Sequence, residues 1–405
     1  MQKGSCLIGQ SGGPTAVINT TLLGIIEEAY RLDAFERVMG SINGIDGVIK
    51  ENFVDFKDYS KEELQLLKTT PSAAIGSVRF HLSDDFNDEI YAKIANVFKK
   101  YNICCFFYIG GNDSMDTCCK LDKYFKSIKY PCNVIGIPKT IDNDMVIIDH
   151  TPGFASAAKF IATSISEIYN DLQCYSHGRV TFIEIMGRDS GWLTASAKVA
   201  SHMGCGADLI YVPEHPFDLN SFLESVQTIY DKNKKVIVAV SEGIKDNDGN
   251  YFLQKRLYNQ NDDFGHLQLG GVGMVLAEIV NKELHLPVRS VELNILQRCA
   301  SHILSKTDIT EAYKCGVYGV RFALKGKTGV MVAMKRVSNN PYRIKYCDVP
   351  LEKIANYVKE LPPCYINEEG NNINDNYLEY ILPLIKGEVK VPLKNGVCQY
   401  FKLKK

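Results

Sequence analysis

Short, nearly uninterrupted apolar runs constrain the fold of this chain most, because each of the first five ends in a loop of polar or charged residues, in four of them with glycine. Such runs are typical of strands covered on both faces, which belong to parallel sheets. They occupy residues 6–8, 103–109, 134–137, 180–185, 236–240 and 330–334. Segments with apolar residues at helical spacing lie between them. The alternation, sustained over about 330 residues, predicts an α/β fold.

Two segments have a clear helical pattern, and the sequence pattern changes near the C-terminus. Residues 14–30 have an apolar residue at nearly every helical repeat, with Thr15 as the expected N-cap and Ser11 as the alternative. Residues 156–172 show the same spacing. Beyond about residue 341, we expect a helix over 350–361, then a loop, a short helix and strands.

Composition excludes several classes of protein. The formal net charge of −1 argues against a nucleic-acid-binding surface, which needs a basic excess. No apolar run approaches the roughly 20 residues that cross a bilayer, so no membrane partner is expected. The N-terminal residues do not read as a signal peptide. The 13 cysteines form no CxxC pair, which favours reduced thiols in a cytoplasmic protein.

The five loops should meet, because ligands of doubly wound sheets bind outside the carboxyl ends of the strands. "SGGP" (11–14) and "GGNDSMD" (110–116) each open a helix, where backbone N–H groups can approach an anion. Asp113 is unusual there, since a carboxylate repels a polyphosphate. It must cap the helix, hold a metal or exclude part of a larger ligand; Ser114 is the other candidate cap.

A lysine and two aspartates follow the buried run at 134–137. In "PKTIDND" (138–144), a carboxylate can accept a proton from a hydroxyl, and Lys139 can neutralise phosphoryl oxygens. A solvated turn is the alternative. Arg188 in "MGRDSG", Arg298 in "LQRC" and Arg79 in "GSVR" supply further cations, although each could be an ordinary surface arginine. Together these loops point to phosphoryl transfer, which is mostly positioning and charge neutralisation.

These motifs together resemble the phosphofructokinase family over residues 4–336, and within it the pyrophosphate-dependent branch. The resemblance implies two Rossmann-like, doubly wound parallel-sheet domains with the active site in the cleft between them, plus a C-terminal extension. The expected division is a phosphoryl-donor-binding domain (1–150 with about 297–340), a fructose 6-phosphate-binding domain (151–296) and the extension (341–405). A 405-residue chain is long enough for two domains.

The resemblance also implies a reaction and roles for residues. Pyrophosphate would reversibly phosphorylate the 1-hydroxyl of fructose 6-phosphate, giving fructose 1,6-bisphosphate and phosphate, with Mg²⁺ as cofactor, as a step of glycolysis. Asp142 would accept the proton, supported by Thr140 and Asp144, with Lys139 and Arg188 also catalytic. The donor would be held by Gly12, Gly13, Arg79, Gly110, Gly111, Asn112, Asp113 and Ser114. The sugar phosphate would be held by Met186, Gly187, Arg188, Glu242 and Arg298, together with Thr140, Asp142 and Asp144.

Arg179 and Arg289 match family positions that reach into a neighbouring subunit's site, which implies a homodimer or homotetramer with shared active sites. The donor is assigned from two positions. ATP-using relatives usually have glycine at the positions of Asp113 and Lys139, so both residues favour pyrophosphate. Some ATP-using relatives carry the lysine, so the donor assignment depends more on Asp113 than on Lys139.

Two positions depart from the family pattern. Asn112 stands where many relatives have a magnesium-associated aspartate, so Asn112 and Asp142 are only weak metal-ligand candidates. Ile295 replaces a histidine of bacterial ATP-using relatives. The alternatives are an ATP-dependent 6-phosphofructokinase and a catalytically silent regulatory subunit. A nicotinamide oxidoreductase would need a GxGxxG motif at the first turn, which "GQSGGP" does not supply.

Overall fold

The computed structural model describes residues 4–253 and 270–404. Its larger sheet has seven strands, of which the five inner ones run parallel and the two edge strands antiparallel. Their order is β11 (Tyr342–Pro350), β10 (Val330–Asn339), β5 (Asn133–Pro138), β4 (Ile103–Gly110), β1 (Ser5–Gln10), β2 (Val38–Ser41) and β3 (Phe53–Asp55). The inner strands β1, β4 and β5 are almost fully buried, as their apolar sequences predict.

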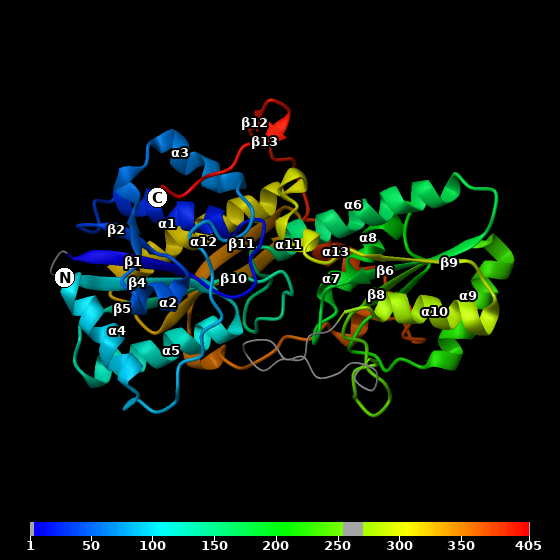
Figure 1. Ribbon diagram of the computed structural model, residues 1–405, viewed down its shortest axis with the longest axis horizontal. Helices are drawn as coiled ribbons and strands as arrows, with labels where there is room; N and C mark the ends of the chain where they lie inside the picture. The colour runs from blue at the N-terminus through cyan, green and yellow to red at the C-terminus, as the bar shows by residue number, and fades with distance from the viewer. Residues whose placement is uncertain (1–3, 254–269, 405) are drawn as a thin grey trace.

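Helices cover both faces of this sheet (Figure 1). One face carries α1 (Ile18–Arg31) and α12 (Lys306–Leu324), and the other α2 (Gly44–Ile49), α4 (Glu89–Lys100) and α5 (Asn112–Ser127). The helix expected over 14–30 begins at Ile18. Thr15 is not its N-cap, because Val17 takes that position and the Thr15 hydroxyl instead accepts a hydrogen bond from the Val17 N–H (3.3 Å).

The smaller sheet has four parallel strands in the order β7 (Leu209–Tyr211), β8 (Lys235–Ser241), β6 (Arg179–Ile185) and β9 (Val288–Glu292). One face packs against α6 (Phe154–Gln173), α7 (Trp192–Ala195) and α8 (Ala197–His202). The other packs against α9 (Leu219–Asn233) and α10 (Val272–Leu284). The two sheets lie side by side along the long axis of the molecule (Figure 1). The expected α/β fold with two parallel-sheet units is therefore confirmed.

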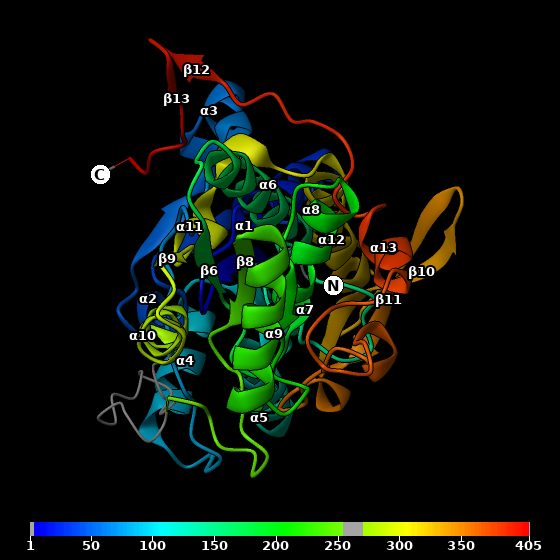
Figure 2. The ribbon, with the colours of Figure 1, turned by 90° about the vertical axis from the view of Figure 1, so that its right-hand side faces the viewer.

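The residues after 341 are integrated with both sheets. Strand β11 is an edge strand of the larger sheet, whereas α13 (Asn376–Ile381) contributes Tyr377 and Ile381 to the apolar core beside the smaller one. Figure 2 shows α13 beside the β10–β11 hairpin. Two short strands end the chain, β12 (Leu393–Lys394) and β13 (Val397–Cys398). The three-domain division stays a prediction, but its last segment supplies a strand of the first sheet.

The prediction of a helix over residues 350–361 is wrong. Only a 3₁₀ turn forms, η4 (Leu351–Lys353), and the following residues are irregular or extended. Asn356 has a positive φ of 68°, and Val358 bridges to Met145 in antiparallel fashion. Tertiary pairing thus overrides a helical apolar pattern.

The remaining short elements are α3 (Lys61–Gln65), α11 (Leu296–Cys299), η1 (Phe56–Asp58), η2 (Leu66–Thr69), η3 (Ser301–Ile303) and η5 (Pro363–Tyr365). All 13 cysteines lie within the described ranges, and none forms a disulfide. No helix in those ranges is both long and apolar enough to span a bilayer.

Candidate active site

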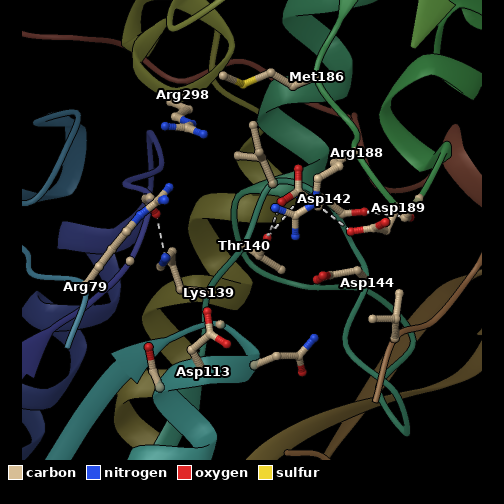
Figure 3. Close-up of a pocket in the computed structure, with 18 of the residues that line it drawn as sticks. Arg79, Asp113, Lys139, Thr140, Asp142, Asp144, Met186, Arg188, Asp189 and Arg298 are labelled. Carbon is tan, nitrogen blue, oxygen red and sulfur yellow. Dashed lines mark hydrogen bonds and ion pairs between the residues drawn. The ribbon is translucent and has the colours of Figure 1, made fainter. Parts of the chain in front are cut away.

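The loops that follow β1, β4, β5, β6 and β8 line one cavity of about 400 Å³, so the carboxyl edges of the two sheets face each other across it. The expected convergence of the five loops is therefore observed. The predicted residues on its wall are Gly12, Gly13, Arg79, Gly111, Asn112, Asp113, Ser114, Lys139, Thr140, Asp142, Asp144, Met186, Arg188, Glu242 and Arg298. Figure 3 shows Lys139, Arg79 and Arg298 on one side in that view, with Asp142 and Arg188 across from them.

The loop after β1 forms an open cradle. Gly12 has a φ of +73°, which disfavours any residue with a side chain. A Cβ at Gly12 would lie 3.3 Å from the Lys139 Nζ, and one at Gly13 would lie 3.4 Å from the guanidinium carbon of Arg298. Two glycines thus keep clear the space beside these two cations. The Ser77 hydroxyl donates to the Gly12 carbonyl (2.7 Å), which ties down the segment that carries Arg79.

Helix α5 begins at the cavity with Gly111 as its N-cap, and no side chain caps it. The capping roles considered for Asp113 and Ser114 are therefore wrong. Asp113 is exposed in the first turn, where the helix dipole favours an anion. The Asn112 side-chain oxygen is buried and has no hydrogen-bond partner among the described residues. This end of α5 presents one carboxylate and one unsatisfied amide oxygen.

The turn after β5 places its charged residues at different depths. Lys139 is 2% exposed, and its ammonium donates to the Gly13 carbonyl at 2.5 Å. Burial lowers the pKa of Lys139 to about 7, and the nearby Arg298 guanidinium adds to this effect. Among the described residues, no carboxylate forms an ion pair with the Lys139 ammonium, so its charge remains incompletely compensated.

Two aspartates of the same turn face the cavity. The Asp142 N–H donates to the Thr140 hydroxyl (3.1 Å), and that hydroxyl donates to the Asp142 carboxylate (3.3 Å). Asn143, between the aspartates, has a left-handed φ of 57°. Burial raises the pKa of Asp144, and the neighbouring Asp142 carboxylate raises it further. Asp142 is thus oriented by Thr140, whereas the charge of Asp144 is disfavoured.

The smaller sheet supplies the opposite wall. The Gly187 N–H donates to the Glu242 carboxylate (3.1 Å), which joins the loops after β6 and β8. Burial raises the pKa of Glu242 to about 7 despite this hydrogen bond. The Arg188 guanidinium pairs with Asp189 at 2.7 Å. Arg298 reaches the cavity from α11, on the side of Lys139 in Figure 3.

Four predicted residues do not line the cavity. Gly110 supports it, because its carbonyl accepts from the Lys139 N–H (2.9 Å), and Gly187 holds Glu242. Arg179 begins β6, and Arg289 lies near the start of β9. Both arginines are therefore at the amino ends of their strands, the ends remote from this chain's cavity.

The cavity also has lining residues that we did not predict. Pro14, Ile141, Asp189 and Ser190 are sequence neighbours of predicted residues, so the loop motifs already located them. Asn356 and Val358 come from the C-terminal extension. They follow no glycine-rich turn after a strand, and the helix expected there gave no reason to place them at a site.

Comparisons with known proteins agree with this geometry. The phosphofructokinase family model matches residues 5–323. A pyrophosphate–fructose 6-phosphate 1-phosphotransferase of Xanthomonas campestris pv. campestris is 39% identical over 412 residues, covering 100% of this chain and 97% of that protein. A protein of the same name from Halomonas elongata is 37% identical over 410 residues, covering 100% of this chain and 97% of that protein.

A solved structure matches as well. The crystal structure of a pyrophosphate-dependent phosphofructokinase from Nitrosospira multiformis superimposes with a TM-score of 0.89 at 36% identity, covering 98% of this chain and 96% of that one. Similarity of this extent, in sequence and in fold, shows that the chain belongs to the phosphofructokinase family.

Proposed function

We propose that this chain transfers a phosphoryl group from pyrophosphate to the 1-hydroxyl of fructose 6-phosphate, reversibly, giving fructose 1,6-bisphosphate and phosphate. The names of the full-length relatives support both substrates. The observation that carries the donor assignment is the pairing of an exposed carboxylate, Asp113, with a buried lysine, Lys139, on the wall of one cavity.

The two residues discriminate between donors in different ways. Lys139 needs an anion to stabilise its charge, and a phosphoryl group supplies one. Asp113 adds negative charge and volume at the start of α5. A small inorganic donor can stay clear of that carboxylate, whereas the α-phosphate side of ATP would be crowded and repelled by it. Pyrophosphate therefore fits the cavity better than ATP.

Asp142 is the proposed general base. Its carboxylate takes the proton of the 1-hydroxyl as the oxygen attacks the nearer phosphorus of pyrophosphate. The bond between that phosphorus and the bridging oxygen breaks, and phosphate leaves with the electron pair. Lys139 stabilises the charge of the phosphoryl group in transit. The hydrogen bond between Thr140 and Asp142 orients the base.

The sugar is proposed to lie against the smaller sheet, with its 6-phosphate reaching Arg298 on the side of Lys139. Arg298 provides a guanidinium for its 6-phosphate, a group that arginine binds through paired hydrogen bonds. Glu242 can accept hydrogen bonds from sugar hydroxyls. Arg188, held by Asp189, stands beside the reacting groups on the second wall.

The metal is proposed to be Mg²⁺, and the residues present fit it. Mg²⁺ binds through one or two carboxylates, keeping waters and substrate phosphates as its other ligands. The unsatisfied oxygen of Asn112 and the carboxylate of Asp142 suit such a sparse set. Among the described residues, no group of three or more His, Cys, Asp or Glu could hold a metal ion without substrate. When bound, Mg²⁺ would neutralise phosphoryl charge.

Arg179 and Arg289 are proposed to complete the site of a second copy. Their places at the amino ends of β6 and β9 put them away from their own cavity, as such a role requires. The assembly would then be a homodimer or homotetramer acting in glycolysis.

A donor assay tests the proposed function. Purified chain, fructose 6-phosphate and Mg²⁺ are incubated with pyrophosphate or with ATP, and fructose 1,6-bisphosphate is quantified. We expect faster turnover with pyrophosphate, and phosphate-dependent formation of pyrophosphate in the reverse direction. Faster turnover with ATP would contradict the donor assignment. Failure to form product with either donor would contradict the enzyme assignment.

A further inference from the structure

The turn that carries the two cavity aspartates is stabilised from a remote part of the chain. Asn143 stands between Asp142 and Asp144 in a left-handed conformation, which asparagine adopts more readily than most residues with a side chain. Because neighbouring side chains leave the backbone in directions set by these dihedral angles, the conformation of Asn143 determines where the aspartates point. The question is what holds it there.

The side chain of Asn143 is fully buried, and its two polar atoms are both satisfied. Its oxygen accepts from the Thr151 N–H (3.1 Å) and from the Lys359 ammonium (3.3 Å). Its nitrogen donates to the Tyr380 hydroxyl (2.9 Å). Two of these three partners thus belong to the C-terminal extension, more than 200 residues away along the chain.

Lys359 binds the turn at several points. Its ammonium also donates to the carbonyls of Ile148 (3.2 Å) and Asp149 (3.0 Å), and its backbone N–H donates to the Asp144 carbonyl (2.6 Å). The lysine is itself fixed by Trp192, whose indole N–H donates to the Lys359 carbonyl (3.1 Å) and whose ring lies 5.0 Å from the ammonium.

The chemistry of these contacts distinguishes Lys359 from a surface lysine. Its ammonium forms no ion pair among the described residues, and it donates to three oxygen acceptors of a single irregular segment. One cation that satisfies three acceptors of the same segment holds that loop in one conformation. Tyr380 does the same with a neutral hydroxyl, since it also donates to the Asp149 carbonyl (2.8 Å).

We propose that Lys359 is a positioning residue of the active site, assisted by Tyr380. Resting on the proposed function, the inference is that the C-terminal extension holds Asn143 in its left-handed conformation. Asp142 is thereby aimed at the attacking hydroxyl. Lys359 touches no substrate; it acts through the turn. A small displacement of a general base costs much of its contribution to rate.

Three variants test this role. Lys359→Met keeps the length of the side chain and removes its hydrogen-bond donors. Tyr380→Phe removes one hydroxyl and leaves every charge in place. Lys353→Met is the matched control, because Lys353 is an exposed lysine of the same extension. Each is assayed with pyrophosphate, fructose 6-phosphate and Mg²⁺, and amide hydrogen exchange of residues 140–151 is followed in parallel.

We expect Lys359→Met to lower kcat by about 10- to 100-fold and Tyr380→Phe by about 3- to 10-fold. KM for both substrates should change less than about threefold, because the binding groups remain in place. Exchange of residues 140–151 should accelerate in both variants and stay unchanged in the control. A KM effect without a kcat effect would overturn the inference, as would unchanged kcat.

The exchange measurement separates this inference from the proposed function. If the wild-type chain were inactive with pyrophosphate, the proposed function would fail, yet exchange would still report whether Lys359 holds the turn. Unchanged exchange in Lys359→Met would overturn the inference, whatever the activity. Should Lys359→Met fail to fold, the kcat and exchange rates of Tyr380→Phe decide the outcome in its place.

Discussion

The two walls of the cavity each bury an ionisable group, and the two groups differ in sign. On the wall of the larger sheet, burial lowers the pKa of Lys139 to about 7. On the wall of the smaller sheet, burial raises the pKa of Glu242 to about 7. Each shift means that burial disfavours the charged form of the group in the free protein.

The difference indicates what each wall receives. A buried amine regains its charge when an anion arrives, so the Lys139 wall suits a polyphosphate. A carboxyl group whose neutral form is favoured can both donate and accept hydrogen bonds, so Glu242 suits sugar hydroxyls. Asp142, oriented by Thr140, lies between the two and serves the reacting hydroxyl. Changes on either wall should therefore affect different kinetic constants.

The largest effect is expected for the residue between the walls. Asp142→Asn retains the shape of the side chain and removes its ability to take a proton, so kcat should fall by about 10²- to 10⁴-fold. Steady-state kinetics with pyrophosphate and fructose 6-phosphate measure it. Asp248→Asn, at an exposed turn, is the control and should keep wild-type kcat. A near-normal kcat for Asp142→Asn would mean that another group is the base.

The next effect concerns the donor wall. Lys139→Met preserves the apolar stem and removes the cation, so kcat/KM for pyrophosphate should fall by about 10²- to 10³-fold. KM for fructose 6-phosphate should change little, since that substrate is assigned to the other wall. Initial rates with each substrate varied in turn provide both constants. A KM for fructose 6-phosphate that rises as much as the KM for pyrophosphate would refute the separation of the walls.

A smaller effect is expected at the group proposed for the 6-phosphate. Arg298→Ala removes the guanidinium proposed for the 6-phosphate, so KM for fructose 6-phosphate should rise by about 10- to 100-fold. This rise corresponds to the free energy of about 1.5–3 kcal/mol that hydrogen bonds to a charged group contribute. Initial rates with fructose 6-phosphate varied give this KM. Arg343→Ala, an exposed arginine on β11, is the comparison and should leave KM unchanged. A rise confined to KM for pyrophosphate would assign Arg298 to the donor instead of the 6-phosphate.

The smallest effect is a pH dependence. With a pKa of about 7, Lys139 is mostly protonated at pH 6 and mostly neutral at pH 8. Pyrophosphate affinity should therefore weaken as pH rises, by up to about tenfold per pH unit above 7. Lys139→Met corrects for the ionisation of pyrophosphate itself. The part of the pH dependence of KM that is present in the wild-type chain and absent from the variant belongs to the lysine. Identical pH profiles for KM of pyrophosphate in both proteins would exclude this role.

Sequence reasoning located the strands and the site where apolar runs and loop motifs coincide. β1, β4, β5, β6 and β8 read as buried runs, and the loops after them form the cavity. β9 (Val288–Glu292) was not predicted, because polar residues, including Arg289, interrupt its apolar ones and leave no apolar run. The extension was misjudged for another reason: Val358 bridges to Met145, a partner that local periodicity cannot reveal. The roles of Lys359 and Tyr380 depend on the same long-range contacts.

The donor preference of an Asp113 variant tests the central claim most directly. Asp113→Gly removes the carboxylate at the start of α5, and Asp113→Asn removes its charge while keeping its volume. The ratio of kcat/KM for ATP to that for pyrophosphate is measured for both variants and for the wild-type chain. We predict that the ratio rises about tenfold or more in Asp113→Gly, about 1.4 kcal/mol, and less in Asp113→Asn. A ratio that stays at the wild-type value in both variants would contradict the account.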